Sequence, residues 1–304
     1  MNFPRTPVIL RSSAFIMLLG AAAIAARPMD LHAQLLNLGA AAGYAGLELN
    51  ASPITFTLSK VTARVNGDIG IANNGSFDFS GGGIITGAIY AGQGATINMS
   101  GGSTATGGLI QPYAGISQAI QDAHTAAAFY AGLTPTQTLA SIGAGTLTGS
   151  GGQNVYQVSG DLALSQGQAL ILSGGASDTF IFNISGQVNL SQANIILSGV
   201  SPSAVLFNLI GTGQKVLSTG HSGTRGVFLA ENGAIQIDGG VHISDFIAGS
   251  TLIWQSGVDI TQATSVGVVA VPEAGSVATF FITVGIVGTL GFLRRKISHR
   301  AAAS

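Results

Sequence analysis

The sequence contains no cysteine. This absence excludes a disulfide-stabilised scaffold, a thiolate metal site and a thiol nucleophile. Only 8% of the residues are charged, against about a quarter in an average soluble chain. Charge this sparse excludes a highly charged disordered chain. It also excludes a nucleic-acid partner, because affinity for phosphate depends on many Lys and Arg side chains.

Glycine, by contrast, is abundant: it accounts for 45 of the 304 residues, about twice its usual share of ~7%. A chain of this length forms one large domain or two small ones. Between residues 34 and 270 the sequence carries four basic and ten acidic side chains, a net charge of −6. This modest negative charge favours solubility and specifies no partner.

The first 33 residues are typical of a signal peptide. Arg5 and Arg11 precede an apolar stretch at residues 14–26, which is shorter than the ~20 residues that span a membrane as a helix. The stretch ends in small residues, so we expect cleavage after Ala25 or Ala26. The alternative interpretation is a buried helix.

The last segment, residues 271–304, carries a second targeting pattern. It begins with Pro272 and Glu273, continues as an uncharged apolar run at residues 277–293, and ends in a basic cluster that includes Arg294, Arg295 and Lys296. This pattern predicts a transmembrane helix whose basic end stays in the cytoplasm.

These residues resemble the PEP-CTERM sorting signal of Gram-negative bacteria, which consists of Pro-Glu-Pro, an apolar helix and an Arg-rich tail. This chain departs from that pattern at the third residue, Ala274. The resemblance implies removal of the signal by a dedicated membrane protease and delivery to the cell surface or the extracellular space, often in strains that make exopolysaccharide. The alternative is an ordinary C-terminal membrane anchor. Both interpretations place residues 34–270, the expected folded domain, outside the cytoplasm.

Short β-rich runs separated by Gly, Asn and Ser fill the chain from Thr55 onward. Several runs alternate apolar and polar residues with a period of two, as strands with one buried face do. The expected strands are residues 55–58, 84–90, 96–99, 154–158, 162–164, 169–172, 179–184, 188–190, 194–197, 204–210, 226–230, 234–237, 241–247 and 251–254.

The arrangement of these runs favours a β-solenoid, with a β-sandwich as the alternative. Similar segments beginning at Val65, Ile85 and Thr104 follow one another at intervals of about 20 residues, the length of one coil of a parallel β-helix. Glycine at the corners allows coils to stack closely. We therefore expect a mainly β fold, an irregular right-handed parallel β-helix.

One segment interrupts the strands. Residues 116–133 are Ala-rich and have apolar residues at helical spacing, and Pro135 blocks continuation. We expect a helix here that covers one apolar side of the solenoid, and a second short helical piece at residues 136–141.

The order of these features resembles the ice-binding-protein-like family (the DUF3494 group) and its adhesin-like relatives. The segments that carry the resemblance are residues 37–47, 65–70, the Ala-rich helix, 155–158 and 179–183. The resemblance covers roughly residues 37–265 and implies a helix packed beside an irregular right-handed β-helix. In that group some members bind ice, and many others are uncharacterised surface proteins.

Ice binding needs a flat, regular face. Thr residues at positions i and i+2 of a strand point the same way, about 6.7 Å apart. The candidate surface-binding residues of this type are Thr55, Thr57, Thr104, Thr106, Thr146 and Thr148. Their spacing in the sequence does not form an evident ladder.

Other chemistry has less support in the sequence. Asp238, His242 and Asp245 lie close together, but we interpret them as turn acids and a surface histidine and expect no metal site or cofactor. His221 and Arg225 lie in a Gly-rich loop, which we interpret as an ordinary surface loop. No Gly-x-Ser-x-Gly or His-Glu-x-x-His motif occurs, so we expect no enzyme activity. Trp254 is expected in the core of the last coil.

The sequence therefore predicts an exported, non-catalytic structural or adhesive protein that presents flat solenoid faces to an extracellular matrix or polysaccharide. Ice binding by one such face is the alternative, and a polysaccharide-active enzyme is a more distant one.

Overall fold

Apolar side chains at every second position join the strands of this chain to one shared core. In β14 (Leu162–Ser165), Leu162 and Leu164 are buried, whereas Ala163 and Ser165 point outward. The computed structural model describes residues 36–51, 53–57 and 63–263, all within the compact unit His32–Ser304. The expected signal peptide and sorting signal lie outside the described residues.

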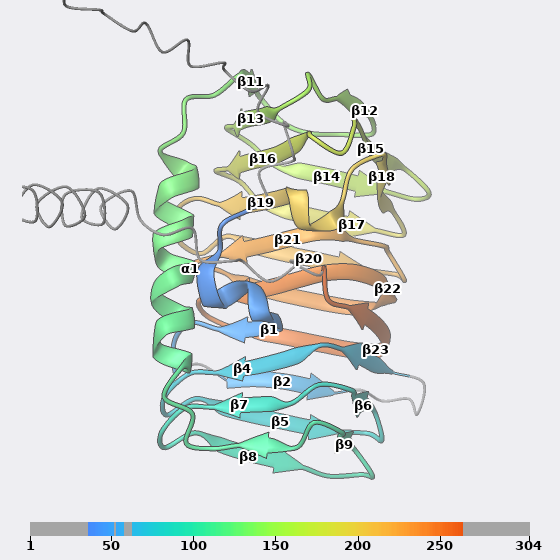
Figure 1. Ribbon diagram of the computed structural model, residues 1–304. Coiled ribbons are helices and arrows are strands. Elements are labelled where there is room, and N and C mark those ends of the chain that lie inside the picture. The colour runs from blue at the N-terminus through green and yellow to red at the C-terminus, as the bar shows by residue number, and fades with distance from the viewer. Residues whose placement is uncertain (1–35, 52, 58–62, 264–304) are drawn as a thin grey trace, which may run out of the picture. The chain divides into compact units, whose positions relative to one another are not determined.

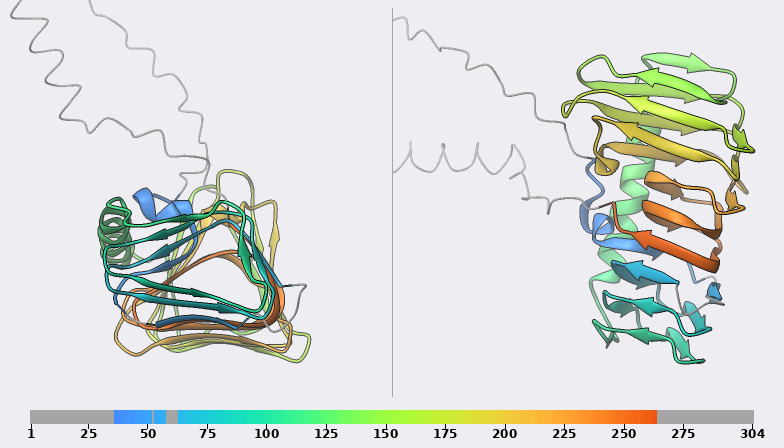
Figure 2. Two further views of the ribbon diagram at one scale, coloured as in Figure 1. Left: turned by 90° about the horizontal axis from the view of Figure 1, so that it is seen from below. Right: turned by 90° about the vertical axis from the view of Figure 1, so that its right-hand side faces the viewer.

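The strands form a parallel β-solenoid, as the sequence predicts, and all the described pairings between its strands are parallel. The expected repeat of about 20 residues is confirmed, because Val65 pairs with Ile85 and Ile85 pairs with Ala105. Seen along the stack, the coils outline a triangle (Figure 2). The molecule therefore has three faces.

The first face, which we call the helix face, is covered by α1 (Ile116–Ala131) (Figure 1). From one end of the stack to the other, its strands are β11 (Gln137–Leu139), β13 (Gln153–Val158), β16 (Thr179–Ile184), β19 (Val205–Leu209), β21 (Arg225–Ala230), the last part of β22 (Ala234–Ala248), β1 (Tyr44–Glu48), β4 (Asp68–Ile71), β7 (Ile89–Ala91) and β10 (Leu109–Ile110).

The second face, the long face, is an unbroken ladder. Its strands are β14, β17 (Val188–Ser191), β20 (Lys215–Thr219), the first part of β22, the first part of β23 (Leu252–Thr261), β2 (Pro53–Thr57), β5 (Ser76–Ser80) and β8 (Thr96–Met99).

The third face is interrupted. At one end, β12 (Gly145–Thr148), β15 (Ala169–Ser173) and β18 (Asn194–Ser198) form a sheet of their own. The short 3-10 helix η2 (Pro202–Ala204) follows β18, and the isolated bridge Asn194–Gly223 lies beside it. The face continues with the middle of β22, the end of β23, β3 (Arg64–Asn66), β6 (Ile84–Ile85) and β9 (Thr104–Ala105).

The order of coils in space differs from their order in the sequence. After the 3-10 helix η1 (Gly39–Gly43), β1 enters the middle of the stack, and the chain then coils toward the end formed by β8, β9 and β10 (Figure 1). Helix α1 carries the chain back to the opposite end, where β11 begins. The later coils then return to the middle, so β23 pairs with β2 and β22 pairs with β1.

Helix α1 is long enough to make this crossing. Its 16 residues rise about 1.5 Å each, so it spans roughly 24 Å, or about five coils at ~4.8 Å. Its Ala-rich inner side packs against outward residues of the helix face such as Ile181 and Leu206. The helix ends at Gly132, and two fully buried amides bind its last carbonyls. Asn183 Nδ2 donates to Tyr130 O (2.7 Å), and Asn208 Nδ2 donates to Ala127 O (3.1 Å).

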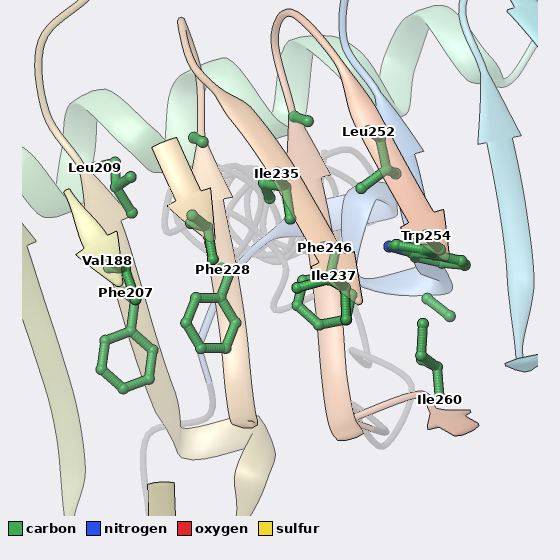
Figure 3. Packing of buried hydrophobic residues seen from close by; sticks show 14 of the residues in the cluster. Val188, Phe207, Leu209, Phe228, Ile235, Ile237, Phe246, Leu252, Trp254 and Ile260 are labelled. Atoms are coloured by element: carbon green, nitrogen blue, oxygen red, sulfur yellow. The ribbon is translucent and has the colours of Figure 1, made fainter. Parts of the chain in front are cut away.

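Stacked aromatic rings fill the core. Phe182, Phe207, Phe228 and Phe246 follow one another on adjacent coils, with ring centroids 5.0, 4.6 and 5.6 Å apart. Figure 3 shows Phe207, Phe228 and Phe246 in sequence, with Trp254 next to Phe246. Trp254 is fully buried, as expected from the sequence.

Acidic side chains tie consecutive coils together at the corners. Asp68 Oδ1 accepts the Ala88 N–H, and Asp161 Oδ1 accepts the Gln187 N–H, both at 2.8 Å and both from the next coil. Asp178 accepts four such bonds, including those from Gly175 N and Gly151 N at 2.8 Å. Burial opposes the charge of Asp178, but these hydrogen bonds outweigh burial and hold its pKa below the usual value.

Two local expectations are wrong. Residues 136–141 were expected to be helical, but they contain strand β11, because this segment pairs with β13 and starts the first coil at that end. The run at residues 84–90 is two strands, β6 and β7, since the chain turns a corner at Gly87, where a Cβ would lie 2.3 Å from the carbonyl oxygen of Gly67.

Candidate functional site

The helix face is closed to large ligands by its own helix. Val155, Ile181 and Leu206 point outward from their strands, yet each is at most 2% exposed because α1 packs on them. A macroscopic surface can therefore approach only the long face or the third face.

The long face presents two columns of outward side chains in register. The first column consists of Ala163, Asn189, Leu217, Gln236, Ile253, Thr55, Asp78 and Asn98. The second column contains Ser165, Ser191, Thr219, Asp238, Gln255, Thr57 and Ser80. Backbone hydrogen bonds fix these positions from both sides in all but the outermost strands.

The register gives this face a regular two-dimensional spacing. Neighbouring residues of one column lie about 4.8 Å apart, and the two columns are about 6.7 Å apart. From β14 to β8 the face extends over eight strands, roughly 34 Å. Near β14, β17 and β20 the side chains are short, and a shallow hollow of about 250 Å³ runs between Ala163, Ser191 and Thr219.

Charged groups lie toward the margins of this face. Lys215 begins β20, and Asp238 occupies the corner at the other side of the face. Asp78 lies toward the far end and accepts a hydrogen bond from Asn98 Nδ2 at 2.8 Å. The area between these groups, which we call the uncharged patch, consists of Ala163, Ser165, Asn189, Ser191, Leu217, Thr219, Gln236, Ile253 and Gln255.

The third face is less regular. Thr146, Ile171 and Ile196 form one column, and Thr148, Ser173 and Ser198 form another, but both columns stop at η2. Beyond the break, Asn66 bonds to Thr261 and Thr86 at 3.4 Å each, which continues a polar row to Thr106. The break leaves two short areas in place of one long one.

The Thr pairs singled out in the sequence do not meet on one surface. Thr55 and Thr57 belong to β2 on the long face. Thr104 and Thr106 lie at the β9 end of the third face, and Thr146 and Thr148 lie at its other end, on β12.

The expectation of a surface histidine at position 242 is wrong. His242 is fully buried, with Nδ1 2.9 Å from Thr224 Oγ1 and Nε2 2.9 Å from Gly239 O. Burial, aided by the charge of Arg225 and opposed by the Gly239 bond, lowers the pKa of His242 to about 4. Asp245 is also buried and accepts the Ala263 N–H, and burial raises its pKa to about 8. Asp238 remains half-buried at the corner.

The reason for this difference lies in the path of β22. The sequence suggests two strands separated by a Gly239-Gly240 turn, but the structure has one bent strand through both glycines. The bend directs His242 inward and leaves Val241 57% exposed. Among the described residues, no three His, Cys, Asp or Glu side chains gather closely enough to hold a metal ion.

The loop with His221 and Arg225 serves the backbone. Arg225 Nη1 donates to Thr224 O at 2.8 Å and to Val241 O at 3.0 Å, while His221 is exposed at φ +62°. Burial lowers the pKa of Arg225. In the described part of the chain, no helix has both the length and the apolar character for a membrane crossing.

Sequence reasoning missed the uncharged patch, although a signal for it exists. The tripeptides Ala163-Leu-Ser165 and Asn189-Leu-Ser191 occupy equivalent places on the long face, and Ile171-Leu-Ser173 and Ile196-Leu-Ser198 do so on the third face. This repeated x-Leu-Ser pattern places an inward Leu between two outward residues, once per coil.

Comparison with solved structures identifies the same fold. An ice-binding protein from the Antarctic ascomycete Antarctomyces psychrotrophicus matches with a TM-score of 0.56 and 22% identity, over 76% of this chain and 99% of that one. The DUF3494 domain of Shewanella frigidimarina ice-binding protein 1 matches with a TM-score of 0.53 and 21% identity, over 77% and 100% of the two chains. An ice-binding protein from an Arctic yeast matches with a TM-score of 0.53 and 18% identity, over 81% and 98%.

Sequence comparison gives the family. A search of curated proteins found no match. The family model described as Ice-binding-like matches residues 50–283, which is more than half of the chain. The chain therefore belongs to the ice-binding-like family.

Proposed function

We propose that this protein binds ice and that the uncharged patch of the long face makes the contact. The observation that carries the proposal is the unbroken register of the long face, which repeats outward side chains on a two-dimensional grid. Membership of the ice-binding-like family and the titles of the structural neighbours support ice over an adhesive partner, the main expectation from sequence.

The physical argument rests on rigidity and weak hydration. Ice is a periodic array of water, so a protein surface matches it only if its own groups are periodic and fixed. The strands hold the patch in place before contact, which reduces the entropy lost on binding. Short uncharged side chains order first-shell water without the strong hydration of charged groups.

Export is a further part of this proposal. The expected signal peptide and PEP-CTERM-like sorting signal, with Pro272, Glu273, Arg294, Arg295 and Lys296, would place the solenoid at the cell surface or beyond it, where ice meets the cell. The sorting protease and the transient membrane helix remain proposed partners of the C-terminal segment.

The test is growth of single ice crystals in the purified protein, with the freezing hysteresis measured in parallel. We expect faceted crystals and a measurable gap between melting and growth temperatures. Thr219→Tyr places a bulky ring in the patch and should abolish most of the hysteresis. Thr86→Tyr makes the same change on the third face and should leave the hysteresis intact.

Two results would overturn the proposal. Round, freely growing crystals with the folded protein would exclude ice as the ligand and make matrix polysaccharide the next partner to test. Loss of hysteresis in Thr86→Tyr but not in Thr219→Tyr would move the ice site to the third face.

A further inference from the structure

The two ends of the solenoid differ in how their core columns terminate. At the end formed by β8, β9 and β10, Met99 follows Phe79 and Leu109 follows Ile89 in the register of the core. With no further coil beneath them, Met99 is 38% exposed and Leu109 is 48% exposed, and neighbouring Ile110 is 39% exposed. We call this surface the open end. Half of the large exposed hydrophobic side chains of the described chain lie there.

The opposite end is closed. There Ile142 is only 5% exposed, and Leu139 and Leu147 are partly buried against the core. The exposed residues of β11 and β12 are Gln137, Thr138, Thr146 and Thr148, together with Gly145. Terminal repeats of solenoids normally have such a polar outer surface, which keeps them soluble. The open end lacks one.

The open end also lacks the devices that protect a strand edge. The N–H groups of Thr96 and Ser100 bond to the preceding coil, so the alternate residues Ile97 and Met99 direct their N–H and C=O groups away from the stack. The Gln111 side chain donates to one such carbonyl, Ala95 O, at 2.6 Å. Edges are usually guarded by charged side chains, but residues 79–121 contain no Asp, Glu, Lys or Arg.

We propose that the open end is a dimer interface that takes a second copy of this chain. An edge strand is completed by another edge strand, and an uncharged end allows two acidic copies to meet there without local repulsion. In a two-fold dimer the same surface serves both partners. The contact buries Met99, Leu109 and Ile110 of both copies.

The two-fold axis follows from the geometry of the faces. An axis normal to the long face sets β8 antiparallel to β8 of the second copy and brings β9 opposite β10. The two long faces then lie in one plane and form a single ladder. Dimerisation itself does not depend on ice binding, but it doubles the length of the surface proposed above.

Sedimentation velocity over a range of protein concentrations tests the proposal without ice. We expect a concentration-dependent monomer–dimer equilibrium. Met99→Lys puts like charges at the interface and should give a monomer at all concentrations, with unchanged thermal stability because Met99 lies at the exposed end. Thr138→Lys, the matched change at the closed end, should leave the dimer intact. A wild-type chain that stays monomeric throughout would overturn the proposal.

Single cysteines distinguish the two-fold dimer from head-to-tail stacking, because the chain has no cysteine of its own. Under oxidation, Asn98→Cys on β8 should form a disulfide-linked dimer, and Thr138→Cys should not. A linked product only in a mixture of the two variants would show head-to-tail stacking and refute the two-fold interface. Hysteresis of Met99→Lys, measured separately, shows whether the monomer retains ice binding.

Discussion

Gly46 of β1 lies directly against the ring of Trp254 of β23, inside the core. A Cβ atom on Gly46 would lie 2.8 Å from Trp254 Cη2 and 3.3 Å from Ile69 Cδ1. The contact marks the place where the coils formed early in the sequence meet the coils formed last. A large buried ring from one set thus occupies the space left by a missing side chain in the other.

Gly46→Ala should destabilise the protein by about 1–3 kcal/mol, because the added methyl group overpacks a rigid ring. The measurement is the free energy of unfolding in urea. Gly43→Ala is the control, since a Cβ there would meet nothing within 4 Å. We expect a change within about 0.5 kcal/mol for the control. Equal losses in both variants would contradict this account.

Asn208→Ala should loosen the end of α1. Asn208 Nδ2 bonds to Ala127 O and to Asn183 Oδ1 (2.9 Å), and its loss leaves buried acceptors without this donor, at a cost of about 1–3 kcal/mol. Amide hydrogen exchange should accelerate in the last turns of α1. Gln157 begins the same column and is half-buried, so Gln157→Ala should leave exchange in the helix unchanged.

His242 should make the protein less stable as the pH falls. Its pKa is about 4 in the folded protein, chiefly because of burial, and about 6.5 when unfolded. The unfolded chain therefore binds the proton first, and up to about 3 kcal/mol of stability is lost between pH 6.5 and pH 4. His242→Gln should remove this loss, measured as unfolding free energy across the window. An unchanged slope would refute the assignment.

Asp245 should have the opposite effect. Burial raises its pKa to about 8 in the folded protein, so the unfolded chain releases the proton first as the pH rises above about 4. Stability contributed by the neutral carboxyl is then lost between pH 4 and pH 8. Asp245→Asn keeps an acceptor for the Ala263 N–H and should make the protein more stable at pH 8 than the wild type. A less stable variant at that pH would contradict the prediction.

Local patterns predicted most elements of the fold. The period-two runs at residues 96–99 and 179–184 are strands with those bounds, and α1 begins at Ile116 as expected. These signals lie within a few residues of each other along the chain. The corner at Gly87 was missed because it depends on a contact with Gly67 in the previous coil, and strand β11 was missed because it depends on pairing with β13.

The candidate site could be predicted only in part, because a face is formed across coils. Thr55 and Thr57 belong to the long face, but their neighbours in the ladder, Ile253 and Gln255, lie about 200 residues away in the sequence. The intervals between coils also vary, so Leu164 pairs after 26 residues and Leu190 after 28. A fixed repeat length therefore does not reveal which residues share a column.

The meeting of early and late coils in the middle of the stack has a consequence for folding and for engineering. Most solenoids grow by adding neighbouring repeats, and they can be shortened from either terminus. Here both chain ends of the described solenoid enter at its centre, and Ile54 pairs with Leu252. Contacts this distant in sequence slow folding and couple the two halves. Trimming either end would remove the joint between the halves, so the protein should unfold as one cooperative unit.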